Sequence, residues 1–182
     1  MADLDLFGAA VRPRRAMGSH QSASDGADEW LTPKWLLDTI GPFDLDPCSP
    51  IDRPWDTAAE HYTIADNGLA KPWRGRVWLN PPYSQAGRWL HRLGEHGHGT
   101  ALIFARTETA LWFDHVWPHA TALLFLRGRL TFHYATGRRA AANSGAPSVL
   151  VAYGERDARR LHERTDLGHV VAQARDGSAP DG

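Results

Sequence analysis

Short apolar runs alternate along the chain with longer stretches in which apolar residues recur at helical spacing. The short runs predict strands and the longer stretches predict helices. The predicted strands cover residues 43–46, 60–63, 76–79, 101–104, 122–126, 130–134 and 149–153, and the predicted helices cover residues 33–41, 84–95, 109–117 and 155–164. This alternation predicts an α/β domain with a mostly parallel sheet, and the close spacing of the late strands predicts an antiparallel hairpin at one edge.

The starts of two predicted helices carry residues that are frequent at helix N-termini. Thr32 is expected to cap the first helix, with Pro33 as its first residue, and Ser84 is expected to cap the second. Most of the eight tryptophans lie in segments with apolar periodicity and are expected in the core; these are Trp35, Trp78, Trp89 and Trp112.

The two ends of the chain lack apolar periodicity. Residues 1–27 and 172–182 are rich in Gly, Ser, Ala, Asp and Arg, so we expect disordered tails there. The ordered domain is expected to cover residues 28–171. A chain of 182 residues is the size of one domain.

Composition excludes several classes of protein. The chain has no apolar run of about 18 residues that would span a membrane and no secretory signal, so we expect no membrane partner and a cytoplasmic location. Cys48 is the single cysteine, which rules out an intrachain disulfide. Pro118 separates His115 from His119 and no H-E-x-x-H motif is present, so we expect no metal.

Arginines are clustered although the net charge is −1. A cluster of this kind is either a nucleic-acid contact or a solvated surface, and the sequence leaves both open. The clusters lie at residues 12–15, 74–76, 127–129 and 138–139.

The loop Asn80-Pro81-Pro82-Tyr83 directly follows a predicted strand and carries the clearest chemical signal. The Asn80 side-chain oxygen and the Pro81 carbonyl are placed to accept the two hydrogens of an exocyclic amine, and Tyr83 to stack on a base outside the duplex. The fixed φ angles of Pro81 and Pro82 hold these acceptors in place. The alternative interpretation is a simple turn, because Asn and Pro are common turn residues.

These segments resemble blocks of the phage-type Dam family of adenine-N6 DNA methyltransferases, and the resemblance runs from about residue 28 to residue 153. The opening Asp28-Glu29-Trp30-Leu31-Thr32-Pro33 resembles the family's D-E-W-x-T-P start, and the loop at residues 80–83 resembles its catalytic loop. Further similar blocks lie at residues 43–49, 66–69 with Trp73, 105–109, 112–113 and 125–129. A glycine-rich G-x-G cofactor turn is missing here, as it is in the family.

The resemblance implies a Rossmann-like class I methyltransferase fold, S-adenosylmethionine as the cofactor and double-stranded DNA as the partner. The residues expected at the cofactor are Trp30, Thr32, Pro33, Asp44, Asp46, Pro47, Cys48, Asp66 and Asn67. Asp44 and Asp46 alternate with apolar residues and so share one face of a strand, although aspartates before a proline are also common turn formers. Trp30 and Trp73 are candidates for stacking on the cofactor.

The resemblance also implies that Arg106, Arg127 and Arg129 contact DNA. Other acceptors remain open, namely cytosine N4, an RNA base or a protein glutamine, as does a DNA-binding module without catalytic activity. The sequence does not indicate the oligomeric state or the DNA sequence that is recognised.

Overall fold

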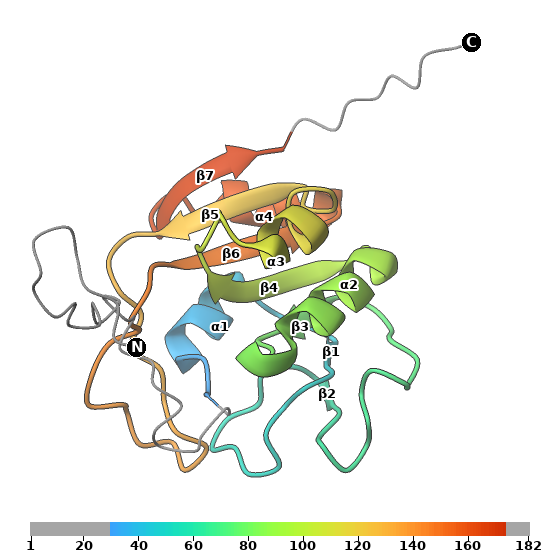
Figure 1. Ribbon diagram of the computed structural model, residues 1–182. Coiled ribbons are helices and arrows are strands. Elements are labelled where there is room, and N and C mark those ends of the chain that lie inside the picture. The colour runs from blue at the N-terminus through green and yellow to red at the C-terminus, as the bar shows by residue number, and fades with distance from the viewer. Residues whose placement is uncertain (1–29, 174–182) are drawn as a thin grey trace, which may run out of the picture.

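The computed structural model describes residues 30–173, in which seven strands form one sheet in the order β2-β1-β3-β4-β6-β5-β7 (Figure 1). The strands are β1 (Leu45–Asp46), β2 (Glu60–His61), β3 (Val77–Leu79), β4 (Gly99–Phe104), β5 (Ala122–Leu126), β6 (Ser148–Tyr153) and β7 (Gly168–Ala172). The helices are α1 (Lys34–Ile40), α2 (Ala86–His96), α3 (Ala110–His115) and α4 (Glu155–His162), with a 3-10 turn, η2 (Tyr83–Gln85), before α2.

The sheet has a parallel half and an antiparallel half. Strands β2, β1, β3 and β4 run parallel, whereas β6, β5 and β7 are joined to one another and to β4 by antiparallel pairings. The prediction of a mostly parallel sheet therefore holds for one half. Because β4 and β5 are both antiparallel to β6 between them, their carboxyl ends lie at the same edge of the sheet as those of β1 and β3.

Alternation of side chains along the strands divides the core between the two faces of the sheet. Trp78 of β3 packs with α1 and α4 on one face, while its neighbours Val77 and Leu79 pack with α2 and α3 on the other. Strands β4 and β6 are buried along their whole length, which explains why they read as continuous apolar runs.

The predicted strand at residues 130–134 is not formed, so the predicted edge hairpin is wrong. Only His133 makes isolated β-bridges there, to Leu31 and Arg139. Leu130 and Phe132 are buried, so their alternation reflects packing against the core without a strand ladder. The antiparallel edge strand is instead β7, which pairs with β5 and was not predicted because most of its residues are exposed or half-buried. It ends at Ala172, one residue beyond the predicted domain, and Gln173 donates its backbone N–H to the Thr121 carbonyl at 3.0 Å. The predicted tails at residues 1–27 and 174–182 lie outside the described residues.

Three local predictions are also corrected. Pro33 is the N-cap of α1, and Thr32 makes no capping hydrogen bond. Ser84 lies inside η2, and the N-cap of α2 is Gln85, so α2 begins one residue later than the predicted cap implied. Trp35 is 53% exposed rather than buried, whereas Trp78, Trp89 and Trp112 are in the core as predicted.

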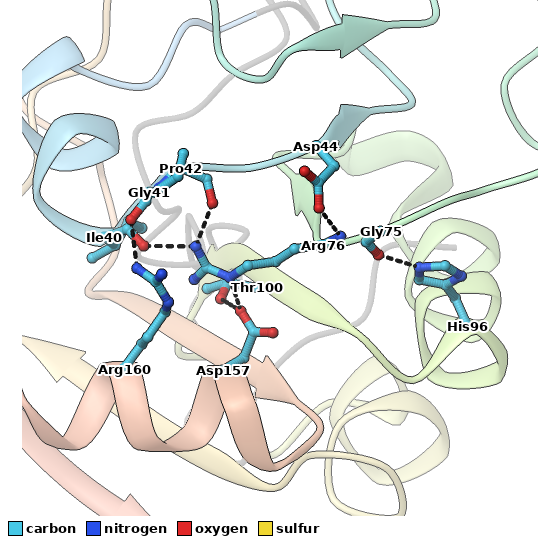
Figure 2. A network of polar contacts seen from close by, with 10 residues as sticks. All are labelled: Ile40, Gly41, Pro42, Asp44, Gly75, Arg76, His96, Thr100, Asp157 and Arg160. Atoms are coloured by element: carbon cyan, nitrogen blue, oxygen red, sulfur yellow. Dashed lines mark hydrogen bonds and ion pairs between the residues drawn. The ribbon is translucent and has the colours of Figure 1, made fainter.

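A buried ion pair links the start of β3 to the helices α1 and α4 on one face of the sheet (Figure 2). Arg76 Nε lies 2.7 Å from Asp157 Oδ1, and both side chains are at most 2% exposed. Arg76 also donates two 2.8 Å hydrogen bonds, to the carbonyls of Ile40 and Pro42, and Thr100 donates to Asp157. Arg76 is thus a core residue, and the solvated-surface interpretation of its cluster is wrong at this position.

None of the helices within residues 30–173 combines the length and the apolar composition that crossing a bilayer requires.

We expect Asp157→Ala to lower the free energy of unfolding by about 3–5 kcal/mol, because it leaves the Arg76 charge buried without a partner. Arg156→Ala, an exposed change on the same helix, is the control and should alter stability by less than about 0.5 kcal/mol. Urea unfolding of the two variants measures both effects. Equal losses of stability in the two variants would contradict the role given to the ion pair.

Candidate active site

A pocket of about 360 Å³ opens at the carboxyl ends of β1 and β3. Asp46 is the last residue of β1 and Asn80 follows the last residue of β3, so two neighbouring parallel strands deliver them to the same edge. Open α/β sheets bind ligands at this edge, and pockets for small molecules span roughly 300–1,000 Å³. The predicted site residues that line the pocket are Trp30, Thr32, Asp46, Pro47, Cys48, Asn67, Asn80 and Pro82.

The amide of Asn80 is anchored by the segment that precedes α1. Its Nδ2 donates a 2.6 Å hydrogen bond to the backbone carbonyl of Trp30. That contact fixes the rotation of the amide and leaves Oδ1 as its acceptor end. Asn80 thus presents an oxygen, held in one orientation, beside the pocket.

Tyr83 lies just beyond the prolines and is backed by a second ring. It stacks on Phe104, with ring centroids 4.5 Å apart and an interplanar angle of 10°. Phe104 is buried at the end of β4, so it supports one face of the tyrosine. The sequence did not identify Phe104 as part of the site, because its position in an apolar strand marked it only as core. Pro81 is buried, and neither Pro81 nor Tyr83 lines the pocket itself.

Asp46 is buried at the base of the pocket, with both carboxylate oxygens hydrogen-bonded. Thr57 donates its hydroxyl to Oδ2, and the backbone N–H of Cys48 donates to Oδ1 at 3.1 Å. Burial raises the pKa of Asp46 from 3.8 to about 6, and these two hydrogen bonds partly oppose the shift. Burial likewise raises the pKa of the Cys48 thiol, so this thiol is neutral at physiological pH. A neutral thiol does not act as a nucleophile.

Two buried polar atoms of the pocket wall have no hydrogen-bond partner: Thr32 Oγ1 and Trp89 Nε1. Buried polar atoms are normally paired, so these two fit a bound molecule that carries polar groups. Trp89 comes from α2 and lies against Trp73 with nearly parallel rings. The sequence placed Trp89 only in the core and gave no sign of this second role.

Gly68 allows the two walls of the pocket to meet. A Cβ atom at this position would lie 2.0 Å from the Pro47 carbonyl oxygen and 3.3 Å from Trp89. Only glycine permits this approach of two backbone segments. The preceding residue, Asn67, also lines the pocket and has a positive φ of 54°.

Two predicted carboxylates are not at the pocket. Asp44 is exposed and accepts the backbone N–H of Arg76 at 2.6 Å, so it stabilises the turn before β3. Asp66 accepts hydrogen bonds from Thr63 and pairs with Lys71 at 2.7 Å. The Lys71 contact is the main reason that the pKa of Asp66 falls to about 2. Of the three carboxylates expected at the cofactor, Asp46 is the one that lines this pocket.

Trp73 and Pro33 are likewise absent from the pocket wall. Trp73 is buried against Trp89 and donates its indole N–H to the Gly68 carbonyl at 2.8 Å. Trp73 therefore supports two residues of the wall from behind.

Three predicted DNA-contacting arginines are exposed at the edge of the sheet that carries the pocket. Arg106 follows β4 by two residues, and its guanidinium lies 5.7 Å from the Phe104 ring centroid. Arg127 and Arg129 follow β5. All three therefore lie at the edge of the sheet at which β4 and β5 end, and none of them lines the pocket itself.

Comparison with known proteins places these features in one family. The family model for Dam, DNA N-6-adenine-methyltransferase, matches residues 18–174. A DNA N-6-adenine-methyltransferase from Escherichia phage T1 is 26% identical over 114 residues, which cover 57% of this chain and 47% of the phage protein. The chain thus aligns with about half the length of that curated relative. No solved structure matches the chain.

The raised pKa of Asp46 predicts how stability depends on pH. Because the folded state binds this proton more tightly than the unfolded state, the contribution of Asp46 is most favourable below pH 3.8 and is lost as the pH rises through about 6. Relative to Asp46→Asn, the wild-type chain should lose roughly 3 kcal/mol of unfolding free energy across this window. Urea unfolding of both proteins from pH 4 to pH 7 measures this difference. Parallel stability curves would contradict the prediction.

Proposed function

The chain belongs to the Dam DNA N-6-adenine-methyltransferase family, and from this membership we propose that it transfers a methyl group from S-adenosylmethionine to adenine N6 in double-stranded DNA. The observation that carries the proposal is the Asn80 amide, which lines the pocket with its Nδ2 anchored on the Trp30 carbonyl. We further propose a Rossmann-like class I fold and a cytoplasmic site of action, in a bacterium or a phage-infected cell.

Asn80 and Pro81 activate the acceptor amine in this proposal. The exocyclic nitrogen of adenine is a poor nucleophile because its lone pair is delocalised into the ring. Asn80 Oδ1 and the Pro81 carbonyl accept its two N–H groups, which makes the nitrogen more tetrahedral and turns its lone pair toward the methyl donor. The prolines hold both acceptors in place before the base arrives, so little ordering is needed on binding.

The pocket supplies groups that suit the methyl donor. When bound, S-adenosylmethionine provides a methyl group activated by a positively charged sulfur. Among the lining residues, all within the described part of the chain, Asp46 is the one carboxylate and Arg88 the one basic side chain. Asp46 would balance the positive charges of the cofactor and Arg88 its carboxylate, while Thr32 Oγ1 and Trp89 Nε1 would pair with its polar atoms. Trp30, Pro47, Cys48 and Asn67 would complete the wall around it.

Tyr83 would hold the target base once it has left the duplex. Flipping a base costs a few kcal/mol, and stacking on an aromatic ring returns about 1–3 kcal/mol. The Phe104 ring behind Tyr83 favours this role because it keeps the tyrosine in one plane. Arg106, Arg127 and Arg129 would contact phosphates or guanine edges of the flanking duplex.

Other acceptors are distinguished by the product. Nucleoside mass spectrometry of unmethylated DNA treated with the protein and S-adenosylmethionine should show N6-methyladenine. N4-methylcytosine, or label found only in RNA or protein, would replace the proposed acceptor. A DNA-binding module without catalytic activity would instead shift DNA in a gel and transfer no methyl group.

In the same assay Asn80→Ala should reduce methyl transfer below detection, because one of the two acceptors of the amine is lost. Its affinity for S-adenosylmethionine, measured by calorimetry, should stay within about threefold of wild type, since the other residues of the pocket wall are unchanged. Normal turnover by Asn80→Ala would contradict the assignment of this residue.

Gly68→Ala tests whether the pocket is the cofactor site. The added methyl group would clash with the Pro47 carbonyl, so we expect the affinity for S-adenosylmethionine to fall at least tenfold. Gly97→Ala is the matched control, because Gly97 has a positive φ of 75° and no atom within 4 Å of an added Cβ. That control should lose about 1 kcal/mol of stability and keep its cofactor affinity. Equal affinities in the two variants would place the cofactor elsewhere.

A further inference from the structure

The connection between β5 and β6, residues 127–147, has a one-sided charge. It contains four of the 20 Lys and Arg residues of the chain and none of the 21 Asp and Glu residues. All four arginines are exposed: Arg127, Arg129, Arg138 and Arg139. In a chain whose net charge is −1, this concentration of positive charge suits a polyanion.

The β5–β6 connection is fastened to the segment that borders the pocket. Leu31 and His133 exchange two backbone hydrogen bonds of 2.8 and 3.0 Å, and the rings of His133 and Trp55 meet edge to face at 5.2 Å. The Trp55 indole donates to the carbonyl of Thr32 at 3.2 Å. Leu31 and Thr32 line the pocket, so the connection is held at the side of the active site.

Three successive contacts lead from this connection to the catalytic amide. The guanidinium of Arg138 lies 4.9 Å from the Tyr134 ring centroid, and the Tyr134 ring lies 5.1 Å from that of Trp30. The Trp30 carbonyl accepts the amide N–H of Asn80 at 2.6 Å. Each contact holds the next residue in place.

The orientation of the Asn80 amide depends on that carbonyl. If the Trp30 carbonyl moved away, the amide would be able to rotate and exchange its oxygen for its NH₂ group. An NH₂ group facing the amine of adenine cannot accept its hydrogen. The position of Trp30 therefore decides what fraction of the protein is ready to activate the amine.

We propose that Tyr134 is a positioning residue for Asn80, acting through Trp30, and that Arg138 above it binds a phosphate of the DNA duplex. This inference rests on the proposed function. The guanidinium fork suits phosphate geometry, and its place over the ring would let DNA binding steady Tyr134 and, through it, the amide.

Tyr134→Phe and Tyr134→Ala form a matched pair for the positioning role. The phenylalanine variant keeps the ring and should retain kcat within about twofold of wild type. The alanine variant should lose about tenfold or more in kcat, a larger factor than any rise in its KM for S-adenosylmethionine from the movement of Trp30 in the pocket wall. Unchanged kcat in Tyr134→Ala, or an equal loss in both variants, would overturn the positioning role.

The side-chain amide of Asn80 gives a readout that needs no turnover. Its NMR signals can be assigned by their disappearance in Asn80→Ala. Because Nδ2 is hydrogen-bonded to Trp30, we expect Tyr134→Ala to shift these signals and Tyr134→Phe to preserve them. This NMR measurement tests the positioning role even if the wild-type protein methylates no adenine. The absence of methylation would refute the proposed function and would not bear on the positioning role. Unmoved Asn80 signals in Tyr134→Ala would overturn the inference.

Arg138→Gln tests the phosphate contact. Arg138 is exposed, so we expect this substitution to leave folding unchanged. The slope of log affinity against log salt for a short unmethylated duplex should become shallower by about 0.9, as expected for one lost phosphate contact. Arg159→Gln, which removes an exposed arginine from α4, should leave the slope unchanged. The same slope in both variants would overturn the role of Arg138.

Discussion

The buried pair of Arg76 and Asp157 is the constraint on which the arrangement of the pocket depends. Arg76 immediately precedes β3, and its guanidinium bonds the end of α1 and the start of α4 on one face of the sheet. The segment that enters α1 lines the pocket, and β3 leads directly into Asn80. One charged side chain therefore ties the strand that ends at Asn80 to α1, the helix that follows the Trp30 segment.

Much of the architecture could be predicted from the sequence because it follows from local periodicity. Strands β4 and β6 are buried throughout and mostly apolar, and α2 presents Trp89, Leu90 and Leu93 at helical spacing. The failures have a different cause. Residues 130–134 alternate like a strand but make only isolated bridges, through His133, and β7 is a short edge strand with no buried residue. Whether such a segment forms a strand depends on the residues far away in the chain that pair with it. The local sequence pattern does not show these residues.

The candidate site was also predicted only in part from the sequence. The loop at residues 80–83 and the segment at residues 46–48 were identified from motif and resemblance, and the pocket includes members of both. The sequence did not identify Thr57, Phe104 and Trp89, because each has the pattern of an ordinary core or turn residue. Their relation to the site follows only from the fold, in which Thr57 bonds Asp46, Phe104 stacks on Tyr83 and Trp89 lines the pocket. Asp44 and Asp66 were included because carboxylates suit a cationic cofactor, yet neither lines the pocket: Asp44 accepts the backbone N–H of Arg76, and Asp66 pairs with Lys71. Residue type alone does not tell a binding carboxylate from a structural one.

The contact between Arg160 and the Gly41 carbonyl bears on how the protein emerges from the ribosome. These residues are 119 positions apart, and at about 5–20 residues per second roughly 6–24 s of translation separate them. During that interval α1 has no α4 to dock on, and Arg76 has no Asp157. The core around α1 is therefore completed only after α4 has been synthesised.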